Sequence, residues 1–268
     1  MAQQKQPDWD SLAEKFDLWL PHIAPVGEAL LAALPIQPGD QVLDVATGTG
    51  EPALTLAQRH PHARIIATDA AAGMVRAAET KRQARRLDNL EFLAMPAERL
   101  EFADASFDKL LCRFGVMLFE DPLQGLKEMY RVLKPGGQYA LAVWSTAQTM
   151  TTMHWAYQVF KHRLREEDHP ALAKVTSLGE DGALASLLNQ AGFHHHSIER
   201  KTFHYQFQSF EEYWDTVEAS DIMKQQFDAL PDQERDDVRD EVARFARDFH
   251  GDNGLVIPHE FLLAYGSK

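Results

Sequence analysis

A short run between residues 42 and 53 combines residue types that suit the binding of a nucleotide-like cofactor. The apolar residues of 42–45 predict a strand that is covered on both faces. Gly48 and Gly50 follow, where the lack of a side chain lets the backbone bend sharply or approach a ligand closely. Pro52 suits the first turn of a helix, because the N–H groups of that turn have no partner within the helix. A strand that passes through glycines into a helix is a device for binding nucleotides.

An acidic residue at the end of the next predicted strand agrees with this interpretation. Asp69 ends the apolar run 64–69 and lies about 20 residues beyond the glycine loop. Its carboxylate can accept hydrogen bonds from two ribose hydroxyls, or it can cap the helix that begins near Gly73. The pattern Gly48-x-Gly50-x-x-Ala53 also fits the dinucleotide fingerprint. An NAD(P)-dependent oxidoreductase is therefore the alternative at this point.

Three further segments bear on which cofactor is bound. Asp44 is an acid within an otherwise apolar strand, and residues 107–112 form the run Phe-Asp-Lys-Leu-Leu-Cys. Residues 129–144 predict a helix end, a Pro-Gly-Gly turn and one more buried strand. With these motifs in this order, the chain resembles the class I S-adenosylmethionine-dependent methyltransferases. The closest likeness is to the branch that contains the ubiquinone/menaquinone C-methyltransferases, and it is strong over about residues 10–145.

The resemblance implies S-adenosylmethionine as the cofactor and indicates which residues hold it. Residues 44–50 look like the family's first motif, 69–74 its second, 107–112 its fourth strand, and 131–137 the turn before its fifth strand. The residues that it implies for the cofactor site are Asp44, Ala46, Thr47, Gly48, Gly50, Asp69, Ala70, Met74, Pro96, Ala97, Glu98 and Arg113.

Two positions depart from the family pattern. Ala46 stands where the family usually has glycine, and its methyl group is small enough for a slightly displaced loop to bind the cofactor. Pro96 stands where many members have an aspartate that faces the adenine amino group. We expect the backbone N–H of Ala97 to face the adenine ring, with Glu98 as a partial substitute for the missing carboxylate.

The alternation of strands and helices from residue 41 to 144 predicts an α/β fold with a doubly wound, Rossmann-like sheet. The resemblance implies seven mostly parallel strands, helices on both faces and an antiparallel last strand. We expect one methyltransferase domain over 1–268. Its parts are a helical cap at 1–35, a cofactor-binding core at 36–145, a substrate-side insertion at 146–180, and a C-terminal part at 181–268.

Several elements outside the core follow from local patterns. Within the cap, helices are predicted at 10–19 and 26–34. Farther on, the patterns predict helices at 153–164, 183–191, 209–219 and 222–249, and strands at 194–207 and 261–265.

The candidates for proton transfer lie in the insertion. A nucleophilic acceptor atom can need a base, and His154 with Tyr157 one helical turn away are the predicted catalytic residues, although His154 also suits a polar cap. Arg113 can hold a carboxylate of the substrate or of the methionine part of the cofactor, or form an external salt bridge. The run His194-His195-His196 does not predict a metal, because neighbouring side chains in a strand point to opposite faces. We expect no metal site.

Composition narrows the class of protein. The 268 residues carry a formal net charge of -13, which disfavours a nucleic-acid partner, and 45% hydrophobic residues, which is ordinary for a globular protein. A single cysteine, Cys112, excludes an internal disulfide and favours a cytoplasmic location. No apolar run is long enough for stable membrane insertion. We therefore expect transfer of a methyl group to a small-molecule acceptor, such as a quinone precursor; the alternatives are the oxidoreductase or a cofactor-binding protein that has lost activity. The acceptor and the oligomeric state are not readable from the sequence.

Overall fold

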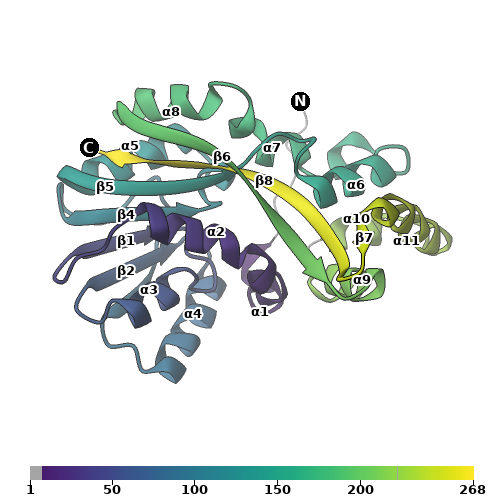
Figure 1. The fold of residues 1–268 in the computed structure, drawn as a ribbon, viewed down its shortest axis with the longest axis horizontal. Coiled ribbons are helices and arrows are strands. Elements are labelled where there is room, and N and C mark those ends of the chain that lie inside the picture. Colours follow the sequence, from purple (N-terminus) through teal and green to yellow (C-terminus); the bar gives the residue numbers. More distant parts are fainter. Residues whose placement is uncertain (1–7, 222) are drawn as a thin grey trace.

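The computed structural model describes residues 8–221 and 223–268, and its centre is one twisted sheet (Figure 1). The strand order is β3-β2-β1-β4-β5-β8-β6, with the two-residue β7 paired to β8. Strands β3, β2, β1, β4 and β5 are parallel, whereas β8 is antiparallel to both β5 and β6. The bounds are β1 Gln41–Val45, β2 Arg64–Asp69, β3 Leu90–Ala94, β4 Phe107–Arg113, β5 Leu133–Trp144, β6 His195–Phe207, β7 His250–Gly251 and β8 Gly254–Ser267.

Helices flank the sheet on both sides, and a second group lies beyond its edge. Figure 1 shows β6 and β8 running past the other strands to reach α6 and α9–α11. The helices are α1 Trp9–Phe16, α2 Leu20–Ala33, α3 Ala53–Arg59, α4 Ala72–Arg85, α5 Pro122–Val132, α6 Thr151–Phe160, α7 Leu172–Val175, α8 Ala183–Ala191, α9 Phe210–Ala219, α10 Lys224–Ala229 and α11 Asp232–Ala246. One-turn 3₁₀ helices lie at Asp17–Trp19, Val116–Leu118, Glu166–Asp168, Ser177–Gly179 and Arg247–Phe249.

The predicted fold class is confirmed: the sheet is mostly parallel, it is flanked by helices, and its last strand is antiparallel. Local capping signals also placed two helices correctly. Helix α8 covers the predicted 183–191 and ends at Gly192, which has a φ of 105°. Helix α9 begins after Ser209, whose side chain accepts from the N–H of Glu212 as the capping pattern predicts.

Some predicted bounds were wrong. Helix α2 begins at Leu20 rather than near residue 26, because Pro21 lies in the first turn and Pro25 removes only one hydrogen bond. Strand β8 extends over 14 residues rather than the five predicted, because β6 pairs with it from residue 255 to 267. The first seven residues of the predicted cap, and Ile222 at the start of the predicted segment 222–249, lie outside the described residues.

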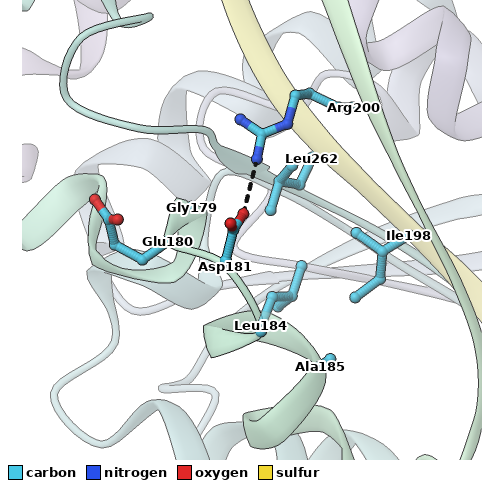
Figure 2. A pocket seen from close by; sticks show the side chains of 9 residues that line it. Gly179, Glu180, Asp181, Leu184, Ala185, Ile198, Arg200 and Leu262 are labelled. Carbon is cyan, nitrogen blue, oxygen red and sulfur yellow. Dashed lines mark hydrogen bonds and ion pairs between the residues drawn. The ribbon is translucent and has the colours of Figure 1, made fainter.

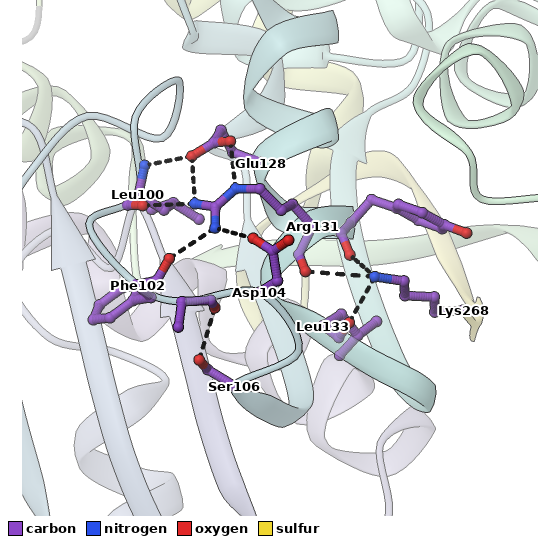
Figure 3. A network of polar contacts seen from close by, with 10 residues as sticks. Leu100, Phe102, Asp104, Ser106, Glu128, Arg131, Leu133 and Lys268 are labelled. Atoms are coloured by element: carbon purple, nitrogen blue, oxygen red, sulfur yellow. Dashed lines mark hydrogen bonds and ion pairs between the residues drawn. The ribbon is translucent and has the colours of Figure 1, made fainter.

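Arg131, the first residue of the Arg-Val-Leu-Lys-Pro-Gly-Gly turn, lies at the centre of a network of polar contacts (Figure 3). Its guanidinium donates twice to Glu128, at 2.8 Å each, and once to Asp104 at 2.8 Å. It also donates to the carbonyl oxygens of Leu100 and Phe102, at 2.8 and 2.7 Å. Arg131 therefore ties the end of α5 to the loop between β3 and β4.

Lys268 closes the same end of α5 from the end of β8. Its Nζ donates to the carbonyls of Tyr130 and Leu133 at 2.7 and 2.9 Å, which satisfies acceptors that the helix leaves free. Its backbone pairs with Gly136 and Gly137 in the turn that begins β5. These contacts fix the amino end of β5, whose carboxyl end lies at the candidate site.

Candidate functional site

The carboxyl end of β1 holds a buried acid with one oxygen that lacks a partner. Asp44 is fully buried, and its Oδ2 accepts from the hydroxyl of Thr47 at 2.7 Å. Its Oδ1 has no hydrogen-bond partner among the described residues. Burial raises the pKa of Asp44 to about 7. A cationic group that reached this oxygen would satisfy it and favour the ionised form.

The loop after β1 turns through left-handed backbone at three positions. Ala46, Gly48 and Gly50 have φ values of 58°, 59° and 104°. A Cβ at Gly48 would meet only the ring of Phe16, at 4.0 Å. Gly48 therefore faces the space between the loop and the N-terminal helices, where a ligand can approach. Ala46 occupies the left-handed region with a side chain, which costs about 1–2 kcal/mol relative to glycine.

Gly50 also has a packing role that the sequence did not predict. Its Cβ would lie 2.8 Å from Leu54, 3.0 Å from Phe92 and 3.1 Å from Ala78. Gly50 thus faces the packed interior rather than the ligand side, and its lack of a side chain serves the packing of α3, α4 and β3. The φ of 104° agrees with the predicted sharp bend at Gly50, and its contact with the cofactor stays a prediction.

Asp69 ends β2 and joins the glycine loop to the start of α4. Its Oδ2 accepts from the N–H of Gly48 at 2.8 Å, and its Oδ1 accepts from the N–H of Ala71 at 2.9 Å. It is not the N-cap residue of α4, since Ala71 holds that position. Burial raises the pKa of Asp69, and the two backbone donors oppose that effect. Each oxygen keeps capacity for another donor, such as a hydroxyl.

The N-terminal helices cover this loop. In the 3₁₀ turn that follows α1, Asp17 accepts from the hydroxyl of Thr49 at 2.5 Å and from Lys81 of α4 at 2.6 Å. Asp10 of α1 accepts from the N–H of Gly73 at the start of α4. The segment is therefore fastened on both sides of the loop. The extent of the predicted cap, core and insertion remains a prediction.

The residues expected near adenine follow β3. Ala97 is buried and Pro96 is exposed. Glu98 accepts from the N–H groups of Glu120 and Asp121, at 2.8 and 3.2 Å, so this carboxylate already stabilises the approach to α5. Its role toward adenine stays a prediction. Of two more predicted residues, Ala70 precedes α4 and is exposed, and Met74 lies in its first turn and is buried.

Arg113 ends β4 beside Asp44. Its side chain is in the neighbourhood of Asp44 and Glu51, whose charges raise its pKa, although burial is the larger effect and lowers it. A Cβ added at Gly27 of α2 would lie 3.6 Å from its Nη1. The next residue, Phe114, has a φ of 61° and stacks on Trp144 with ring centroids 3.9 Å apart. Arg113 and these rings lie at the carboxyl ends of β4 and β5.

The predicted catalytic pair lies on α6. His154 Nε2 is 3.2 Å from Gln158 Nε2, and its buried Nδ1 has no partner among the described residues. The ring of Tyr157 meets that of His169 at 5.9 Å. The contacts that the structure gives these two residues, Gln158 and His169, thus lie within residues 151–169. Their catalytic role is untested and stays a prediction.

Other features of the described residues lie apart from the loop. Across residues 8–221 and 223–268, no cluster of His, Cys, Asp and Glu could hold a metal ion. A cavity of about 220 Å³ opens between α8 and strands β6 and β8 (Figure 2). Arg200 lines it but is paired with Glu260 at 2.9 Å and Asp181 at 3.5 Å.

In the same described range, no helix is long and apolar enough to cross a membrane. Burial raises the pKa of Cys112 to about 12, so its thiol is not a nucleophile.

Sequence reasoning missed four residues that shape this site. Asp10 and Asp17 fasten the N-terminal helices. The ring of Trp19 lies 5.6 Å from that of Tyr205, whose charge acts on Arg113. No sequence signal identified the two acids, because their partners are 32 to 64 residues away.

The sequence is similar to those of known methyltransferases. A family model described as the ubiE/COQ5 methyltransferase family matches residues 27–205. A demethylmenaquinone methyltransferase of Deinococcus radiodurans is 46% identical over 101 residues, which cover 38% of this chain and 42% of that protein. A ubiquinone/menaquinone biosynthesis C-methyltransferase of Geotalea daltonii is 40% identical over 119 residues, which cover 44% of this chain and 51% of that protein. The chain thus spans about half the length of these curated relatives.

The fold has close counterparts among solved structures. A SAM-dependent methyltransferase of Aquifex aeolicus superposes with a TM-score of 0.52 and 25% identity, and the match covers 72% of this chain and 89% of that one. The matching family model confirms the resemblance that the sequence motifs predicted.

Proposed function

Because this chain belongs to the ubiE/COQ5 methyltransferase family, we propose that it transfers a methyl group from S-adenosylmethionine to a small aromatic acceptor. The names of the relatives suggest a quinone precursor as the acceptor class. The observation that carries the proposal is the placement of two acids, Asp44 and Asp69, on either side of the loop whose Gly48 faces the ligand side.

The residues present suit the cofactor. The unpartnered oxygen of Asp44 would accept from the ammonium group of the methionine part, and Asp69 has capacity left for the ribose hydroxyls. Thr47 orients Asp44, and the loop at Ala46 and Gly48 would hold the middle of the cofactor. On the adenine side, we propose Ala97 as a backbone donor, with Pro96, Glu98, Ala70 and Met74 around the ring.

The cofactor supplies a methyl group on a sulfonium, and its transfer to a nucleophile leaves a neutral thioether. The work left to this chain is to align two reactants and to exclude water. The N-terminal helices fit the second task, because Asp10 and Asp17 fasten them across the loop. His154 and Tyr157 remain the candidates to accept a proton from the acceptor.

The class of acceptor and the cellular location are also proposals. We propose a small molecule rather than a nucleic acid, because the chain has a formal net charge of -13. We propose a cytoplasmic location, because the one cysteine is free and buried and suits a reducing compartment.

The test is a direct assay of methyl transfer. The protein is incubated with methyl-labelled S-adenosylmethionine and a dithionite-reduced demethylmenaquinol with a short isoprenoid chain, and the product is analysed by mass spectrometry. The expected result is a product heavier by one labelled methyl group, together with S-adenosylhomocysteine. Binding of S-adenosylhomocysteine without transfer to this or related quinols would reject the proposed acceptor class. Binding of NAD in its place would reject the proposed reaction.

A further inference from the structure

Arg113 is a cation that forms no ion pair with the described residues of the proposed site. The residue is half-buried, and no hydrogen bond or ion pair joins its guanidinium to any residue that the structure describes. The carboxylates whose charges act on Arg113 are Asp44 and Glu51, and neither forms an ion pair with it. Glu51 accepts from Arg85 at 2.9 Å and from the N–H of Thr55 at 3.2 Å. Asp44 accepts from Thr47, and its other oxygen is the one proposed above for the ammonium group of the cofactor. A positive charge that is partly withdrawn from water and has no ion-pair partner is costly, so its retention indicates a ligand of opposite charge.

Two neutral donors near Arg113 also lack acceptors. Trp19 is 7% exposed, and its buried indole N–H has no partner within the described part of the chain. Tyr205 is 6% exposed, and no hydrogen bond joins its hydroxyl to a described residue. The centroids of the two rings lie 5.6 Å apart. Burial raises the pKa of Tyr205, and the positive charge of Arg113 opposes that effect. Three donors from β4, β6 and the turn after α1 thus share one region without an acceptor.

The surroundings of these donors are flat and aromatic. Trp144 stacks on Phe114 at 3.9 Å and lies parallel to Phe203 at 5.8 Å. His259 stacks on Tyr205 at 4.0 Å, and burial lowers the pKa of this histidine to about 3, so it stays neutral. Such walls favour an aromatic ring, because rings pack face to face or edge to face. The only fixed positive charge that we find among them is that of Arg113.

We propose that Arg113, Tyr205 and Trp19 form a subsite for an oxyanion of the methyl acceptor, so that the acceptor is an aromatic molecule that carries an ionised hydroxyl or a carboxylate. The inference rests on the proposed function and names its substrate class. An anionic oxygen would accept from all three donors and neutralise the charge of the half-buried Arg113. An ionised ring hydroxyl would also make the adjacent ring carbons more nucleophilic.

The test compares an anion with a neutral molecule of the same shape. Protein saturated with S-adenosylhomocysteine is titrated calorimetrically with 2-naphthoate and with 2-naphthamide. The parent is expected to prefer 2-naphthoate by about tenfold or more. Arg113→Met should abolish the preference, and Tyr205→Phe should reduce it several-fold. The control Arg59→Met removes an exposed arginine paired with Glu28 and should keep the full preference. Equal affinities for both ligands in the parent, or a preference that survives Arg113→Met, would overturn the inference.

A second set of titrations separates this inference from the proposed function. The affinity for S-adenosylhomocysteine is measured for the parent and for each variant. An Arg113→Met variant that loses this affinity but keeps the naphthoate preference would assign the arginine to the cofactor and overturn the inference. If the parent does not bind S-adenosylhomocysteine, the proposed function fails. The naphthoate comparison on the free protein then still decides whether the oxyanion subsite exists.

Discussion

Replacement of Arg131 by methionine is the sharpest stability test that the structure offers. Methionine keeps most of the aliphatic stem but removes the guanidinium that joins α5 to the loop between β3 and β4 (Figure 3). The carbonyl oxygens of Leu100 and Phe102 would lose their charged donor. Glu128 would keep only the N–H of Leu100, at 2.9 Å.

The expected loss of unfolding free energy follows from the two hydrogen bonds that Arg131 donates to carbonyl oxygens. A hydrogen bond to a charged group contributes about 1.5–3 kcal/mol, so the pair sums to about 3–6 kcal/mol. The Arg131 side chain is 30% exposed, so water replaces part of what is lost and reduces the cost to about 2–4 kcal/mol. Asp104 is 79% exposed, and we assign its ion pair no share of this figure. For a chain of this size, such a loss lowers Tm by about 5–15 °C.

The assay is thermal unfolding followed by circular dichroism, with Arg59→Met as the matched control. Arg59 also forms a two-pronged pair with a glutamate, Glu28, with both distances at 2.7 Å, but both side chains are at least half exposed. The control should therefore leave Tm almost unchanged. Equal shifts in the two variants would refute the reasoning, because they would show that the carbonyl contacts of Arg131 add nothing to an ordinary surface pair.

Three further predictions concern the cofactor loop. Ala46→Gly should raise Tm by a few degrees, because relief of about 1–2 kcal/mol of left-handed strain exceeds the added freedom of the unfolded chain; a lower Tm in thermal unfolding would contradict this. Gly50→Ala should lower Tm more than Gly48→Ala, because only the Cβ added at Gly50 meets core atoms, at 2.8 to 3.1 Å. Gly48→Ala should mainly weaken the binding of S-adenosylhomocysteine, measured by calorimetry. The reverse ranking would refute the directions assigned to the two glycines. Burial raises the pKa of Asp44 from 3.8 to about 7, so the folded chain holds a proton there that the unfolded chain releases. The unfolding free energy of the parent should therefore fall relative to Asp44→Asn as pH rises from about 4 to about 7, and then stay constant. Affinity for S-adenosylhomocysteine should rise over the same pH range in the parent but not in Asp44→Asn. Chemical denaturation measures the unfolding free energy across this range, and calorimetry measures the affinity. If the parent and the variant gave the same pH dependence, the role assigned to Asp44 would be wrong.

The sequence predicted the parts of the fold that depend on local pattern. Strands 41–45 and 64–69 are apolar runs bounded by turn residues, and the helix after Ser209 carries its own capping signal. The order of the motifs placed Asp44 and Asp69 at neighbouring strand ends, because parallel strands share one carboxyl edge.

Other features depend on contacts between distant segments, which no local pattern contains. The length of β8 comes from pairing with β6, and the reason for Gly50 comes from side chains of α3, α4 and β3. The unpartnered donors of Arg113, Trp19 and Tyr205 come from three separate elements. A single aromatic or basic residue in the sequence gives no sign of whether its polar atom will find a partner.

The central claim is that the loop after β1 binds S-adenosylmethionine, and the most direct test is thermal unfolding with S-adenosylhomocysteine and with NAD. A ligand at about 100 times its dissociation constant stabilises the folded state by about 2.7 kcal/mol. For a chain of this size, that corresponds to a rise in Tm of about 5–11 °C. The account predicts this rise with S-adenosylhomocysteine and none with NAD. A rise with NAD alone, or with neither ligand, would contradict it.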